Sequence, residues 1–155
     1  MWAGDITYIR TLEGWLYLAV VLDLYSRRVV GWSTSSSLET GLCLVALNRA
    51  VEQRRPGAGL ICHSDRGSQY ASHTYRDRLD ELLYRCSMSG SGNCYDNAVV
   101  ESFFDTLKTE ELDGVYATRQ QAHEAVFSYV EGFYNLRRKH STLGGLSPAD
   151  FEAQA

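Results

Sequence analysis

The sequence predicts a single α/β domain over residues 1–155, with a mixed β-sheet flanked by helices. Three segments rich in β-branched and aromatic residues open the chain, which is typical of the strands of a meander. Strand-like and helical segments then alternate, and the last third of the chain has helical periodicity alone. Strands in series followed by alternating helices and strands indicate a sheet covered by helices.

The three opening strands are expected to pair antiparallel, because short polar turns separate them. These turns contain Glu13-Gly14 and Tyr25-Ser26-Arg27. The second strand is apolar at successive positions, which predicts that helices cover both of its faces. The expected strands are Asp5–Arg10, Trp15–Asp23 and Arg28–Ser33.

The middle of the chain predicts two helices, each followed by a short strand. Leucine and valine recur at helical spacing in the first helix, which Pro56-Gly57 ends. The second helix is expected to turn Tyr75, Leu79, Leu82 and Leu83 toward the core. The two strands bring the expected sheet to five. The elements are a crossover helix at Leu38–Arg55, a strand at Leu60–His63, a helix at Ser72–Leu83 and a strand at Tyr84–Met88.

The final third of the chain predicts three helices. One apolar stripe marks the first of them, formed by Val100, Phe103, Phe104 and Leu107. Asp96 and Asn97 would most simply cap its start. Thr118–Gln121 has the form of a capping box, and one apolar face continues over residues 122–133. Pro148 predicts the first turn of a last short helix.

The composition bounds the function only loosely. The net charge of −4 does not by itself favour nucleic acid, but thirteen of the fifteen basic residues are arginine, which can grip a phosphate with two hydrogen bonds. The four cysteines form no close pairs and, with four scattered histidines, show no zinc-site spacing. No apolar stretch is long enough to span a bilayer, so we expect a soluble cytoplasmic protein.

Three acidic residues could belong to one site. Asp5 lies in the first expected strand, Asp65 follows the fourth, and Glu101 borders the apolar stripe of the following helix, with thirty-five residues between Asp65 and Glu101. Each acid alone has an ordinary explanation, as a strand-edge charge, a turn residue or a solvated helix residue. On residue type alone Asp23 competes with Asp5, because it too lies in an expected strand.

Three carboxylates without Cys or His at ligand spacing favour a hard cation, Mg²⁺ or Mn²⁺. Two such ions about 3.5–4 Å apart can activate an attacking oxygen and stabilise the leaving oxygen at one phosphodiester. Such a site needs no covalent enzyme intermediate.

Several different short motifs follow one another along nearly the whole chain. They are Asp5-Ile6-Thr7-Tyr8, residues 21–32, His63-Ser64-Asp65-Arg66-Gly67, residues 96–104, Tyr134-Asn135, His140-Ser141 and Ser147-Pro148. Their order and spacing resemble the catalytic core of bacterial insertion-sequence transposases of the IS-three family, which is similar to retroviral integrase. The resemblance implies a ribonuclease-H-like fold in which Asp5, Asp65 and Glu101 are the catalytic, metal-binding acids, and it leaves Asp23 a structural role or a supporting role beside the site.

The resemblance also implies a reaction, the metal-dependent cleavage and strand transfer of DNA at the ends of an insertion element. Lys108 matches a lysine that contacts DNA near the reacting end in related integrases. The other candidate DNA contacts are Asn97, Arg137, Arg138, Lys139 and His140.

The expected partner is DNA, both as element ends and as target, with no membrane association. A homo-oligomer is expected because two DNA ends must be brought together. Because the chain starts four residues before Asp5, we also expect a helix-turn-helix segment upstream or on another polypeptide. The implied location is the bacterial cytoplasm, at the nucleoid. Two other interpretations stay open at this point, a nuclease that only hydrolyses and an inactivated DNA-binding or oligomerisation module.

Overall fold

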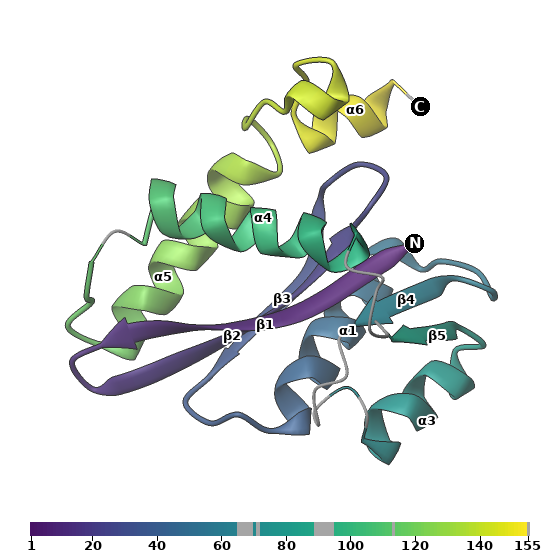
Figure 1. Ribbon diagram of the computed structural model, residues 1–155, viewed down its shortest axis with the longest axis horizontal. Coiled ribbons are helices and arrows are strands. Elements are labelled where there is room, and N and C mark those ends of the chain that lie inside the picture. Colours follow the sequence, from purple (N-terminus) through teal and green to yellow (C-terminus); the bar gives the residue numbers. More distant parts are fainter. Residues whose placement is uncertain (65–69, 71, 89–94, 113, 155) are drawn as a thin grey trace.

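The computed structural model describes residues 1–64, 70, 72–88, 95–112 and 114–154. Its strands are β1 (Trp2–Thr11), β2 (Gly14–Asp23), β3 (Val29–Ser35), β4 (Ile61–Ser64) and β5 (Arg85–Met88). They form a five-stranded sheet in the order β3-β2-β1-β4-β5 (Figure 1). The first three strands pair antiparallel, whereas β4 pairs parallel with both β1 and β5. The predicted mixed five-stranded sheet is confirmed.

Helices lie on both faces of this sheet (Figure 1). They include α1 (Thr40–Arg54), α3 (His73–Glu81), α4 (Tyr95–Glu110), α5 (Arg119–Tyr129) and α6 (Pro148–Ala153). Alternate residues of β2 enter two separate apolar cores. Leu18 and Val20 pack with α4 and α5, whereas Ala19 and Val21 pack with α1 and α3. The prediction that both faces of this strand are covered is therefore confirmed.

α1 approaches β3 closely at Gly31. A Cβ atom at this position would lie 2.2 Å from the carbonyl oxygen of Ala46 and 2.8 Å from the Cβ of Ala50. Both alanines are themselves buried. Because glycine has no Cβ, it alone lets the helix and the strand come this close.

α5 does not continue as a regular helix to residue 133. The chain makes a π-helical turn over Val130–Tyr134, and the Asn135 N–H donates to the carbonyl of Val130 at 3.2 Å. The wider turn changes the helical phase, so Tyr134 is buried whereas Phe133 is 40% exposed. The prediction that the apolar face continues through Phe133 is wrong for this reason.

Two further local predictions are wrong. Leu83 was expected in the core, but α3 ends at Glu81 and Leu83 has φ 60° and is 67% exposed. Asp96 and Asn97 were expected to cap a helix, but α4 already begins at Tyr95 and includes both residues. In both cases the helix boundary, which periodicity locates poorly, decides the outcome.

The C-terminal segment packs against the turn between β2 and β3 (Figure 1). The side chain of Asn135 accepts a hydrogen bond from the Val29 N–H at 2.9 Å and donates one to the Val29 carbonyl at 3.0 Å. It thereby satisfies both backbone groups of Val29, as a neighbouring strand would. From α6, Glu152 accepts a hydrogen bond from the Ser26 hydroxyl at 2.8 Å. These contacts hold the turn that carries Arg27.

Candidate active site

Asp5 lies where the parallel pairing between β1 and β4 ends. The last paired residues are Gly4 on β1 and Ser64 on β4, and Ser64 directly precedes Asp65 in the sequence. Across the antiparallel pair, Asp5 lies opposite Val20, which packs in the core with α4 and α5. Residues directly opposite each other in such a pair share a face of the sheet. The Asp5 side chain therefore lies on the side of the sheet that α4 covers.

Glu101 lies on α4, next to the residues that anchor this helix. Its neighbours Val100 and Phe104 are buried, whereas Glu101 itself is exposed. α4 packs on the same face of the sheet as the Asp5 side chain. The structure thus brings Asp5 and Glu101 to one side of the sheet, with the helix-borne acid at the margin of the buried stripe.

The third predicted acid, Asp65, lies outside the described residues. Within the described part of the chain, no group of three His, Cys, Asp or Glu side chains that could hold a metal ion is found. A set that includes Asp65 would extend beyond these residues. The metal-binding role of the three acids therefore stays a prediction.

Tyr70 lies against β1 beside Gly4. A Cβ atom on Gly4 would lie 3.4 Å from the Tyr70 hydroxyl. Burial raises the Tyr70 pKa well above its usual value, and nearby Cys43, Tyr75 and Asp5 raise it further. Tyr70 is therefore a neutral phenol throughout the physiological range.

Asp23, the last residue of β2, has partners for its carboxylate. Its carboxylate accepts a hydrogen bond from the Tyr25 N–H at 2.9 Å and lies 3.7 Å from the Arg54 guanidinium. Arg54 also bonds to Glu152 of α6. These contacts support the structural role expected for Asp23.

Lys108 lies two turns along α4 from Glu101, so both project from one side of the helix, here called the acid flank. The Lys108 ammonium lies 5.7 Å from the centroid of the Tyr8 ring on β1. Asn97 belongs to the first turn of α4, and its side chain lies outside the described part. DNA contacts by Lys108 and Asn97 stay predictions.

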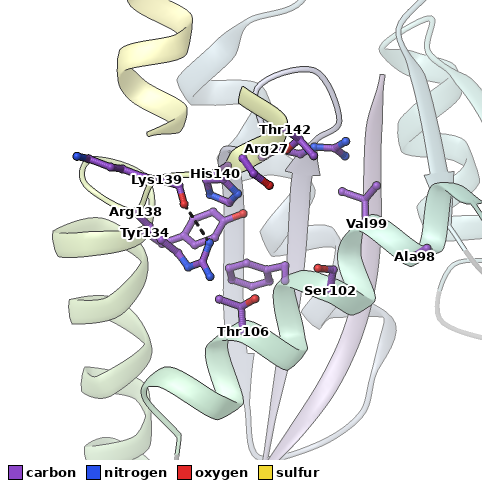
Figure 2. Close-up of a pocket in the computed structure, with 12 residues that line it drawn as sticks. Arg27, Ala98, Val99, Ser102, Thr106, Tyr134, Arg138, Lys139, His140 and Thr142 are labelled. Carbon is purple, nitrogen blue, oxygen red and sulfur yellow. Dashed lines mark hydrogen bonds between the residues drawn. The ribbon is translucent and has the colours of Figure 1, made fainter. Parts of the chain in front are cut away.

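The opposite side of α4, here called the donor flank, carries Ser102 and Thr106 and borders a cavity of about 610 Å³. Figure 2 shows these two residues facing Tyr134 and the basic segment across the cavity. Three of the four predicted DNA contacts in the segment 137–140 line it, namely Arg138, Lys139 and His140. Arg137 is exposed and is not among the lining residues.

Arg138 is held in place by Glu110, the last residue of α4. Its Nε lies 3.0 Å from Oε1 of Glu110 and its terminal nitrogen lies 2.9 Å from Oε2. The hydrogen bond with Arg138 lowers the Glu110 pKa, and that with Tyr129 lowers it further. The carboxylate is thus charged, and it fixes one guanidinium at the rim of the cavity.

His140 is a partly buried member of the basic lining. Burial lowers its pKa below the usual value, and the charges of Arg138 and Arg27 lower it further. Its Nε2 atom is buried without a hydrogen-bond partner in the described part of the chain. Its ring packs edge to face against that of Tyr134, with 5.2 Å between the ring centroids.

Sequence reasoning missed Arg27, Ser102 and Thr106 as members of this cavity. Arg27 belongs to a turn more than a hundred positions from the basic segment, and no spacing in the sequence joins the two. The two hydroxyl residues carried a weak signal, because they recur at i, i+4 on one face of a helix.

Solved structures with a similar fold come from retroviral integrases. The chain superposes with a TM-score of 0.75 on a protein of a simian T-cell lymphotropic virus intasome, at 17% identity, covering 97% of this chain and 52% of the other. The TM-score is 0.67 for the HTLV-2 integrase catalytic core domain in complex with magnesium, at 17% identity, covering 97% of this chain and 93% of that domain. The architecture is the ribonuclease-H-like fold expected from the sequence.

Family models make the assignment more specific. Two models described as "Integrase core domain" match residues 1–94 and 101–155. The chain belongs to the integrase core domain family.

Two bacterial transposases are among its relatives. The chain is 51% identical over 154 residues to the transposase InsF for insertion sequence IS3fB of Escherichia coli K12, covering 99% of the chain and 54% of that protein. It is 47% identical over 153 residues to the transposase for insertion sequence element IS904 of Lactococcus lactis, covering 98% of the chain and 60% of that protein. The chain thus spans little more than half the length of these relatives. Among its described helices, none is long and apolar enough to cross a membrane.

Proposed function

We propose that this chain is the catalytic core of an insertion-sequence transposase and that it cuts and joins DNA with Asp5, Asp65 and Glu101. The observation that carries the proposal is the position of Asp5 and Glu101 on one side of the sheet, beside the end of the β1–β4 pairing. In open α/β sheets, sites form at the ends of neighbouring parallel strands. The sequence identity of 51% and 47% to two bacterial transposases supports the same chemistry.

The donor set fits a hard cation. Asp5 and Glu101 offer carboxylate oxygens, and Asp65 would supply a third, so Mg²⁺ or Mn²⁺ is the expected ion, in two copies. When bound, the ions would lower the pKa of the attacking oxygen and neutralise charge on the phosphate. The HTLV-2 core of the same fold was solved in complex with magnesium.

The reaction needs only an exchange of phosphodiester bonds. In the first step water attacks phosphorus, the bond to the 3′ oxygen breaks, and that oxygen takes up a proton to become a free 3′ hydroxyl. In the second step this hydroxyl loses its proton and attacks a target phosphodiester, so that one P–O bond forms while another breaks. The carboxylates would hold the reacting groups in line, and Lys108 on the acid flank would contact the DNA near them.

The wider setting belongs to the same proposal. The partner is DNA, as element ends and target, and the chain acts as a homo-oligomer that joins two ends. Recognition of the ends would require a helix-turn-helix segment beyond these 155 residues, which fits a chain that spans about half of its relatives. The proposed location is the bacterial cytoplasm, at the nucleoid.

The test is a combined cleavage and joining assay. The protein is incubated with supercoiled plasmid and a labelled duplex bearing a free 3′ hydroxyl, with Mg²⁺, with Mn²⁺ or with EDTA. We expect metal-dependent nicking and transfer of the label into the plasmid. Glu101→Gln should reduce both by about a thousandfold or more, since the group would act directly on the reacting atoms.

Asp105→Asn is the matched control, because Asp105 is an exposed acid one turn further along α4. It should retain both activities. Metal-dependent nicking without transfer of the label would favour the hydrolysis-only nuclease. Activity that survives Glu101→Gln unchanged would contradict the assignment of the site.

A further inference from the structure

The cavity on the donor flank of α4 is lined by hydrogen-bond donors and carries no carboxylate. It lies between α4, the segment 134–142 and the turn between β2 and β3 (Figure 2). Two arginines, one lysine and one histidine line it, together with four Ser or Thr hydroxyls and one phenol. In a chain with a net charge of −4, such a lining is a marked local departure. A site of this kind favours an anionic ligand with several oxygen atoms.

Most of these donors have no partner in the described part of the chain. The side chains of Arg27 and Lys139 make no ion pair there, although Arg138 pairs with Glu110. The hydroxyls of Ser102 and Thr106 make no hydrogen bond with the described residues either. With respect to the described residues, these groups are therefore available to bind a ligand without first breaking a hydrogen bond or ion pair.

Arg27 occupies a backbone conformation that normally favours glycine. Its φ is 64°, and its N–H donates to the Asp23 carbonyl at 2.8 Å within the turn. Hydrogen bonds from Ser26 and Arg28 to Glu152 of α6 hold this turn. An arginine in a left-handed turn is unfavourable for the backbone, so its side chain at the cavity is the feature that needs an explanation.

The two flanks of α4 are separate surfaces. Glu101 and Lys108 lie seven residues apart on the acid flank, whereas Ser102 and Thr106 lie four apart on the donor flank. A ligand in the cavity would therefore lie across α4 from Glu101. Nucleic acid is long enough to contact both flanks at once.

We propose that this cavity binds a backbone phosphate of DNA, held by Arg27, Lys139 and the hydroxyls of α4, at a distance from the phosphodiester that reacts. That the ligand is DNA rests on the proposed function. Phosphate contacts of this kind come from Arg, Lys, Ser, Thr and Tyr side chains, and they position DNA without reading its sequence. The cavity is larger than one phosphate group requires, which leaves room for the adjoining sugar.

The test compares two arginines with the same backbone conformation. Arg27→Gly removes the side chain and keeps a residue that favours positive φ. Arg55→Gly is the matched control, because Arg55 has φ 44° at the end of α1 and does not line the cavity. Binding is measured by fluorescence anisotropy on two duplexes of unrelated sequence, in EDTA, over a range of salt concentrations.

Arg27→Gly should weaken binding to both duplexes equally, by about tenfold at low salt. It should also reduce the slope of log affinity against log salt by about one, because one phosphate contact is lost. Arg55→Gly should leave affinity and slope close to those of the unchanged protein. Equal effects of the two substitutions, an unchanged slope with Arg27→Gly, or no binding by the unchanged protein would overturn the proposal.

A ³¹P NMR titration with inorganic phosphate tests the remaining source of the ligand. If inorganic phosphate binds through Arg27 while Arg27→Gly leaves the affinity for DNA unchanged, the cavity takes a free anion and the proposal fails. Because binding is measured in EDTA, it does not require a metal ion at the catalytic acids. Loss of binding with Arg27→Gly but no effect of Glu101→Gln on cleavage would reject only the proposed catalytic site.

Discussion

The two flanks of α4 differ in the charges that they carry, in the elements that surround them and in how far the sequence predicts them. The acid flank carries Glu101 and Lys108, and α4 lies on the face of the sheet to which Asp5 also belongs. The donor flank faces a cavity whose other walls come from a turn near residue 27 and from the segment 134–142. One helix thus separates the flank on which we propose catalysis from the basic cavity in which we propose that DNA is held. Function on either side depends on how this helix is anchored.

The largest expected effect should fall on both flanks alike. Gly31→Val would place a Cβ atom 2.2 Å from the carbonyl oxygen of Ala46, and this backbone atom cannot move aside as the end of a side chain can. We expect a loss of about 3 kcal/mol or more in the free energy of unfolding, by urea denaturation. Gly41→Val is the control, because a Cβ at Gly41 would meet no atom within 4 Å. Similar losses for both would contradict the close packing of α1 on β3.

A second substitution should affect the donor flank selectively. Asn135→Ala would leave the buried N–H and carbonyl of Val29 without their partners, at a cost of about 2–3 kcal/mol in the free energy of unfolding. It would also loosen the segment that carries Arg138, so affinity for DNA should fall while metal binding is retained. Asn48→Ala removes a partly buried amide that bonds Arg78 and should cost less than about 1 kcal/mol. Equal losses for the two asparagines would contradict the role of Asn135 in joining the C-terminal segment to β3.

The two flanks of α4 show what the sequence could and could not predict. The position of Glu101 beside the buried stripe of α4 was predictable, because helical periodicity is read along one segment of the sequence. The donor flank was only half predictable. The basic run at 137–140 is visible in the sequence, but Arg27 reaches the same cavity through tertiary contacts made by Asn135 and Glu152.

The errors have a similar physical origin. Periodicity assumes a regular helix, so it could not foresee the π-helical turn that buries Tyr134 and exposes Phe133. It also assumes that a helix continues, so it placed Leu83 in the core although the chain has already turned away. Both errors lie where a helix gives way to another backbone conformation.

The smallest expected effect is a pH dependence confined to the donor flank. The folded protein lowers the pKa of His140 below 6.5, so the unfolded chain binds the proton more tightly. The contribution of His140 to stability is therefore complete above about pH 7 and declines as the pH falls below 6.5. We expect the melting temperature to fall slightly more between pH 7.5 and 5.5 for the unchanged protein than for His140→Gln.

DNA should reverse this trend. A bound phosphate would stabilise the protonated imidazole, so DNA affinity should rise on acidification more for the unchanged protein than for His140→Gln. His123→Gln is the control, because His123 lies on α5 and bonds Thr34 away from the cavity. A pH response of DNA affinity that is the same in all three proteins would show that the cavity and its ligand do not interact with His140.

The most direct test of the central claim is calorimetric titration of the protein with Mn²⁺. The proposed site predicts binding by the unchanged protein and by Asp105→Asn, and its loss in Asp5→Asn, Asp65→Asn and Glu101→Gln with the fold retained by circular dichroism. Since three carboxylates hold the ions, neutralising any one should weaken binding by at least about tenfold. Binding that is the same in all five proteins would contradict a metal site at these three acids.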